Sequence, residues 1–167
     1  DLKQKKVIRE FEPGIIPFSL VLANDNWCFI APKDPNWSPL RSLNLQTGTV
    51  HHDPAMYVFW GSTNIYRIPG TTTILGLSEP SNFAYLFDYS TDSIFRNNSL
   101  NSNVLGEKAW FSYNQKFMIS SNNLIYKIEQ PEGKTIKFSM YAEIENNNYS
   151  ISGYSDCPET QKAYIST

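Results

Sequence analysis

The chain has 167 residues, with 14 basic and 16 acidic side chains and a formal net charge of −2. This near-neutral balance excludes a strongly basic nucleic-acid-binding domain. The length predicts one domain over residues 1–167, with a polar tail from about Pro158 and a core that needs no metal or disulfide scaffold. No apolar run approaches the ~20 residues of a membrane-spanning helix, so we expect no membrane insertion.

Cys28 and Cys157 are the only two cysteines, and neither belongs to a CxxC motif or a Cys/His cluster. A zinc site is therefore not expected. The sequence is compatible with two free thiols and also with a disulfide between them. The opening residues 1–6 carry no apolar stretch and do not predict a signal peptide.

Short aromatic and β-branched runs, broken by Gly, Pro, Asn and Asp, predict an all-β protein with very little helix. The predicted strands are residues 7–11, 18–23, 27–30, 55–68 with a break at Gly61, 71–77, 83–87, 108–113, 124–128, 135–144 and 149–154. Some eight to ten strands match a two-sheet antiparallel jelly-roll sandwich. No repeat of fixed period is visible, which argues against a propeller.

Two stretches are predicted to be long loops. Residues 31–54 include Pro32, Pro35 and Pro39, which cannot donate to a sheet ladder, and residues 40–45 could form one helical turn. Residues 88–106 are polar, with Asn and Ser at their centre. We expect both loops to become ordered by packing on neighbouring subunits.

A terminal hairpin is predicted from residues 135–144 and 149–154. Ile136, Phe138 and Met140 alternate with polar side chains and should face the core. Ile151 should lie on the same buried side, in the strand that pairs with them.

The only cluster of catalytic residue types is His51-His52-Asp53. Adjacent residues of an extended chain point to opposite sides, so these three cannot form a triad by themselves. The cluster also precedes Pro54 in a predicted loop. We therefore expect an exposed or interfacial pair, with a catalytic base or a metal ligand as open alternatives. No catalytic residue, metal or cofactor is predicted, and the chain is not expected to be an enzyme.

The basic start of the chain could face RNA phosphates, although a solvated strand start explains it equally well. Its four basic side chains are Lys3, Lys5, Lys6 and Arg9.

Three segments resemble, in order, the coat proteins of picorna-like viruses, nearest to the insect-infecting dicistroviruses and iflaviruses. Residues 2–11 (LKQKKVIREF) resemble the basic-aromatic stretch that opens the jelly roll in that family. Residues 56–68 (MYVFWGSTNIYRI) resemble a family strand, although Trp60 stands where an Arg precedes the Gly. Residues 138–154 with Pro158 resemble the terminal hairpin, with Asn147-Asn148 in place of paired acids.

This resemblance implies an eight-stranded jelly roll that serves as a structural subunit of an icosahedral capsid. The expected partners are sibling coat chains in a hetero-oligomeric shell, genomic RNA weakly at its interior, and a host receptor. The expected location is the virion, and the host cytoplasm during assembly. The alternative is a carbohydrate- or cell-surface-binding β-sandwich, lectin-like or a viral attachment domain, with aromatic residues clustered on one exposed face. A hydrolase that uses His51 or His52 is a third reading.

Overall fold

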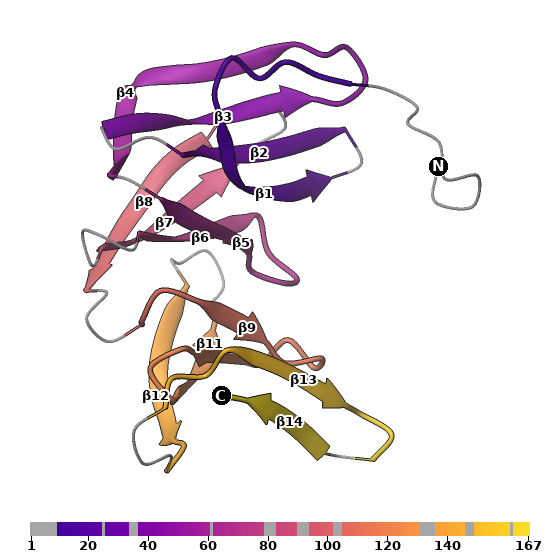
Figure 1. Cartoon of the computed structure of the whole chain (residues 1–167), viewed down its shortest axis with the longest axis vertical. Coiled ribbons are helices and arrows are strands. Elements are labelled where there is room, and N and C mark those ends of the chain that lie inside the picture. The colour runs from indigo at the N-terminus through magenta and orange to yellow at the C-terminus, as the bar shows by residue number, and fades with distance from the viewer. Residues whose placement is uncertain are drawn as a thin grey trace.

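The computed structural model is a stack of antiparallel β-sheets (Figure 1). It describes residues 10–24, 26–33, 37–60, 62–78, 83–89, 94–101, 105–130, 136–145, 149–160 and 162–167. Every regular element in these ranges is a strand, which confirms the all-β prediction. A search of the same ranges finds no helix long and apolar enough to cross a membrane.

Three four-stranded sheets follow one another along the chain, and a two-stranded hairpin comes last. The first sheet contains β1 (Pro17–Asn24), β2 (Trp27–Pro32), β3 (Trp37–Asn44) and β4 (Val50–Trp60). The second contains β5 (Thr63–Arg67), β6 (Thr73–Ser78), β7 (Phe83–Tyr89) and β8 (Ile94–Asn101). The third contains β9 (Ala109–Phe111), β10 (Phe117–Ser120), β11 (Leu124–Glu129) and β12 (Lys137–Glu143). The hairpin is β13 (Gly153–Cys157) and β14 (Lys162–Ser166).

Within each sheet the strands lie side by side in chain order. A jelly roll instead needs long connections that pair non-consecutive strands. The predicted two-sheet jelly roll therefore differs from the observed order of the described strands. Short turns produce this sequential strand order, because a tight turn places each strand beside the one that precedes it in the chain. One such turn is closed by Gly48, whose N–H donates to the Asn44 carbonyl at 2.8 Å.

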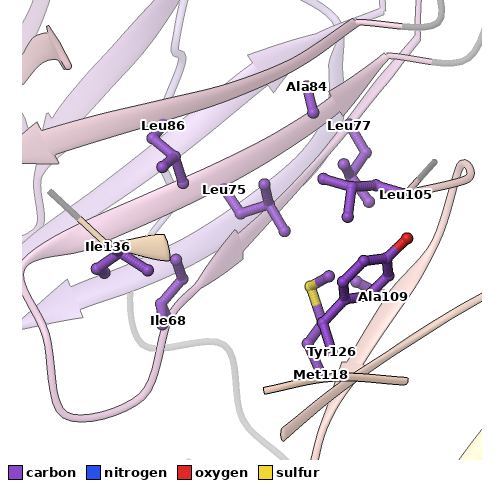
Figure 2. Close-up of a cluster of buried hydrophobic side chains, with 10 residues drawn as sticks. All are labelled: Ile68, Leu75, Leu77, Ala84, Leu86, Leu105, Ala109, Met118, Tyr126 and Ile136. Carbon is purple, nitrogen blue, oxygen red and sulfur yellow. The ribbon is translucent and has the colours of Figure 1, made fainter. Parts of the chain in front are cut away.

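The second sheet is buried on both faces, because the other two sheets pack against it. Ile74 and Phe87 face the first sheet, and Leu75, Leu77 and Leu86 face the third. Figure 2 shows the second of these cores, where Met118 and Tyr126 approach from the third sheet. Burial on both faces explains why β6 reads as one nearly continuous apolar run.

Two predicted loops contain strands. Within residues 31–54, β3 and the start of β4 form, and Pro39 of β3 lies at a register shift in the β3–β4 ladder. Within residues 88–106, β8 pairs along the whole of β7. Both loop predictions were wrong, because backbone pairing with a neighbouring strand does not require apolar side chains. These strands pair within the chain and need no neighbouring subunit for it.

The two ends of the chain also differ from the prediction. Residues 7–9 of the first predicted strand lie outside the described ranges, and Glu10 and Phe11 are not in a strand. The predicted terminal hairpin is wrong, because β12 pairs with β11 while β13 pairs with β14. The polar tail from Pro158 therefore contains a strand.

The predicted burial along β12 is only partly correct. Ile136 and Ile151 are buried, and Phe138 packs against the core between the second and third sheets. Met140, however, is 68% exposed. It lies in the outermost strand of its sheet, just before a register shift in the β11–β12 ladder, and no further described strand pairs with that edge.

Candidate functional site

A pocket of about 370 Å³ lies between the β9–β10 turn of the third sheet and the β13–β14 hairpin. In Figure 1 the hairpin lies across the third sheet, near the C-terminus of the chain. A volume of this size is typical of sites for small molecules. The lining residues are Ser112, Tyr113, Asn114, Phe117, Tyr154, Asp156, Cys157, Pro158, Lys162 and Ala163.

The β9–β10 turn is fixed by short-range side-chain hydrogen bonds. Ser112 Oγ accepts from Phe117 N at 3.0 Å, and Asn114 Oδ1 accepts from Lys116 N at 3.0 Å. Gln115 has a φ of 61°, a left-handed conformation that such tight turns use. These constraints hold the turn in one conformation and leave Tyr113 70% exposed at its tip.

Asp156 joins the hairpin to this turn. Its Oδ2 accepts a hydrogen bond from Tyr113 N at 2.8 Å, across 43 residues of sequence. The Tyr154 phenol lies beside the same carboxylate. Burial of Tyr154, together with the charge and the hydrogen-bond acceptor of Asp156, raises the pKa of Tyr154 to about 12. At neutral pH the pocket therefore contains a neutral phenol held beside a carboxylate.

Aromatic rings form one wall of the pocket. Phe117 contacts Tyr141 of β12, with ring centroids 5.0 Å apart and an interplanar angle of 55°. Tyr113, in the same turn, also lines the pocket and has most of its surface in solvent. Aromatic faces in such positions can stack against the apolar face of a bound ring.

Charges at the pocket are few. Among the described residues that line it, Lys162 is the one cation and Asp156 the one carboxylate. Just beyond the lining, Glu159 Oε2 accepts a hydrogen bond from Cys157 Sγ at 3.1 Å. Lys116 lies in the turn between the lining residues Asn114 and Phe117. With Lys162, it balances the charges of Asp156 and Glu159, so the surroundings favour neither sign of ligand charge.

The residues singled out in the sequence do not gather at this pocket. His51 and His52 lie next to each other in β4, so they point to opposite faces of the first sheet, and both are exposed. The loop predicted for them was wrong. The ring of His51 contacts Trp27, with centroids 5.8 Å apart. Lys3, Lys5, Lys6 and Arg9 lie outside the described ranges, so the RNA-facing start stays a prediction.

The structure leaves both thiols free. Cys28 is buried in the first sheet, whereas Cys157 is half-buried in the hairpin. Burial raises the pKa of the Cys28 thiol. The described ranges contain no group of three or more His, Cys, Asp or Glu that could hold a metal ion.

Sequence reasoning missed Tyr113, Tyr154 and Asp156 as a site. The Ser-Tyr-Asn sequence at 112–114 is a turn signal, and an aromatic residue within a turn is often exposed. Nothing local, however, indicates that this turn meets a carboxylate 43 residues further on.

No protein-family model matches the chain, and no curated protein matches it. Solved structures with a similar fold include two from Bacteroides. One is a putative 6-phosphogluconolactonase from Bacteroides uniformis ATCC 8492, with 11% identity and a TM-score of 0.62 over 89% of this chain and 46% of that one. The other is a protein of unknown function from Bacteroides thetaiotaomicron VPI-5482, with 13% identity and a TM-score of 0.55 over 91% of this chain and 38% of that one.

The chain thus spans less than half the length of either of these two solved structures. At these identities the likeness concerns the fold alone. Neither structure is described as viral.

Proposed function

We propose that the chain is a sugar-binding module on a propeller-like stack of sheets, and that the pocket between the third sheet and the hairpin holds a small neutral polyhydroxylated ligand. Consecutive four-stranded meanders packed face to face are the building pattern of β-propellers. Such stacks are rigid, and the loops between their strands form binding sites. This proposal keeps the carbohydrate-binding function expected as the alternative and replaces its β-sandwich scaffold.

The observation that carries the proposal is the Tyr113–Asp156–Tyr154 arrangement. The Asp156 carboxylate accepts a hydrogen bond from the backbone N–H of Tyr113 and lies beside the neutral phenol of Tyr154, so it is positioned before a ligand arrives. A carboxylate has about four lone-pair sites, so it keeps acceptor capacity for ligand hydroxyls. Tyr113 and Phe117 supply aromatic surface for the C–H face of a pyranose ring.

The charge balance favours a neutral ligand. Among the described lining residues, a phosphorylated sugar would meet one cation, Lys162, close to the carboxylates of Asp156 and Glu159. Sites for phosphate commonly use clustered Arg or Lys side chains or a helix N-terminus. The name of the putative 6-phosphogluconolactonase implies a phosphorylated substrate for that protein. The few cations described at this pocket do not favour such a ligand here.

Binding is tested by titrating ¹⁵N-labelled chain with neutral monosaccharides and disaccharides and following the amide shifts. We expect millimolar affinity, with shifts concentrated at residues 112–117 and 154–163. Tyr113→Ala and Asp156→Asn should each weaken binding about tenfold, because each removes one contact worth ~1–1.5 kcal/mol. Tyr149→Ala is the matched control, since Tyr149 is 64% exposed but does not line the pocket.

Two outcomes contradict the proposal. One is that no neutral sugar shifts the pocket amides, and the other is that both pocket variants bind as well as the control. The same samples are assayed for hydrolysis of a sugar lactone. Turnover that Asp156→Asn abolishes would assign the pocket to an enzyme instead of a binding module.

The capsid subunit stays a prediction that rests on the sequence resemblance. Its expected contacts were argued from a jelly roll, and the sequential sheet order offers that argument no support. Sedimentation of the chain from its natural source is the test. Recovery in a closed particle with sibling chains and RNA would favour the coat protein over the sugar-binding module.

A further inference from the structure

Tyr141 of β12 presents an exposed aromatic ring immediately beside the pocket. The centroid of its ring lies 5.0 Å from that of Phe117, which lines the pocket, whereas Tyr141 itself does not line it. Of the surface of Tyr141, 65% is exposed. The aromatic wall of the pocket therefore continues past Phe117 onto the open surface of the third sheet.

The register of the third sheet places Tyr141 on its outer face, away from the second sheet. Phe117 pairs with Lys127 of β11, and Lys127 pairs with Ser139 of β12, so these three side chains share one face. Met118, next to Phe117, packs in the core toward the second sheet, so the shared face is the outer one. Tyr141 follows Ser139 by two residues, and its ring reaches Phe117 across β11, the strand between them.

A β-bulge lies at this point of β12. The ladder passes from the Ile125–Ala142 pair to the Tyr126–Met140 pair, so Tyr141 is the extra residue of its strand. A bulge bends its strand and can re-aim a side chain, and bulges are over-represented next to active sites. The bulge leaves Tyr141 with no residue directly opposite it in β11 and with its ring beside the pocket wall.

The outer face around Tyr141 is polar and carries charges of both signs. Lys127 Nζ and Glu129 Oε1 form an ion pair at 3.3 Å, with 54 and 42% of the two side chains exposed. Lys137 pairs with Glu129 in the ladder, and Ser139 is exposed beside Lys127. These groups supply hydrogen-bond donors and acceptors next to an aromatic ring. A sugar matches this combination, because its C–H face is apolar and its rim carries hydroxyls. A flat apolar protein surface does not, because it would remove water from the ion pair.

We propose that the pocket binds one unit of a neutral oligosaccharide and that Tyr141 stacks against the next unit of the same sugar chain. The inference rests on the proposed sugar-binding function and adds the length of the ligand to it. One lining residue of the pocket, Tyr113, is 70% exposed, so the pocket is open to solvent and a longer ligand can extend out of it. A ligand that leaves the pocket along Phe117 meets Tyr141 next. The second contact then forms within a ligand that is already bound, which raises the affinity.

The test compares ligands of increasing length on the ¹⁵N-labelled full chain. Three series are titrated, those of glucose, mannose and galactose, each as the monosaccharide and its β-1,4-linked disaccharide and trisaccharide. In the series that binds, we expect the trisaccharide to bind about tenfold more tightly than the monosaccharide, as one added aromatic contact provides. Amide shifts at residues 139–142 should appear with the longer ligands and not with the monosaccharide.

The deciding measurement is the ratio of the monosaccharide and trisaccharide dissociation constants. Tyr141→Ala should lower this ratio from about ten to about one, whereas Tyr141→Phe, which keeps the ring, should preserve it. The ratio is informative because any disturbance of Phe117 by the lost contact affects both ligands and cancels. Met140→Ala is the matched control, since Met140 is 68% exposed and adjacent in the strand but pairs with Tyr126, which packs toward the second sheet. This control should keep the wild-type ratio.

Equal affinity for the monosaccharide and the trisaccharide in the wild type overturns the inference and leaves the proposed function standing. An unchanged ratio in Tyr141→Ala, or an equal fall in Met140→Ala, also overturns it. If no member of the three series shifts the pocket amides, the proposed function itself fails and the inference fails with it. Far-ultraviolet circular dichroism checks that the variants fold. If Tyr141→Ala does not fold, Tyr141→Leu replaces it with the same expected ratio, because leucine keeps apolar volume without a flat ring.

Discussion

Gly106 is the position where adding a single methyl group should have the clearest effect on stability. Its φ is +70°, a left-handed conformation that side chains disfavour. A Cβ at this position would lie 2.5 Å from Ser121 Oγ and 2.8 Å from Asn122 Oδ1. Ser121 cannot simply move away, because its Oγ accepts hydrogen bonds from Glu107 N at 3.1 Å and Lys108 N at 3.2 Å.

The cost of Gly106→Ala has two parts. The left-handed backbone contributes about 1 kcal/mol for a residue that carries a Cβ. Displacing Ser121 weakens two hydrogen bonds to backbone N–H groups, each worth about 0.5–1.5 kcal/mol. We expect a total loss of about 2–4 kcal/mol in the free energy of unfolding. Gly14→Ala is the matched control, because Gly14 has a φ of +69° with no atom within 4 Å of the added Cβ. It should lose only the backbone part, about 1 kcal/mol.

The measurement is urea unfolding followed by circular dichroism on both variants, on Ser121→Ala and on the double variant Gly106→Ala/Ser121→Ala. The double variant should be more stable than the sum of the two single losses predicts, because removing Ser121 Oγ also removes the closest contact of the added Cβ, although the contact with Asn122 remains. If Gly106→Ala costs no more than Gly14→Ala, or if the two changes are additive, the close approach to Ser121 does not contribute to stability and the reasoning is wrong.

Two further predictions concern the core and the pocket. Met118→Ala should lower the free energy of unfolding by about 2–5 kcal/mol, because Met118 is fully buried between the second and third sheets; exposed Met140→Ala should stay within about 0.5 kcal/mol in the same urea experiment. Tyr154 has a folded pKa of about 12 against a usual value of 10, so its contribution to stability is complete below pH 10 and is lost as pH rises through 12. Ultraviolet titration of the tyrosinates should show Asp156→Asn lowering the pKa of Tyr154 but not that of Tyr126, which burial alone raises to about 12; equal shifts at both would contradict the assigned contact.

The sequence by itself determined where most strands lie. Apolar patterns placed β1, β2, β6, β7, β11 and most of β12 within a few residues. β4 ends at Trp60 and β5 begins at Thr63, on either side of the predicted break at Gly61, which lies outside the described residues. These predictions succeed because a strand with one or two buried faces has a period that is readable locally.

Composition failed to predict strands whose pairing depends on backbone hydrogen bonds and not on apolar side chains. β8 (IFRNNSLN) was read as a polar loop, but its ladder to β7 depends on N–H and C=O groups that every non-proline residue has. β3 was read as a loop because of Pro39, which the register shift accommodates.

Only the tertiary structure decided which strands pair and which faces meet. The alternation of Ile136 and Phe138 predicts a buried face in a jelly roll and in a stack of meanders alike, because both bury one side of a strand. Their actual partners, Leu75 and Leu86 of the second sheet among them, are set by the order in which the sheets stack. The pocket depends on the same long-range order, since Asp156 meets Tyr113 only after the third sheet and the hairpin have packed together. Local periodicity encodes which side of a strand is buried, but contacts between distant segments determine what buries it.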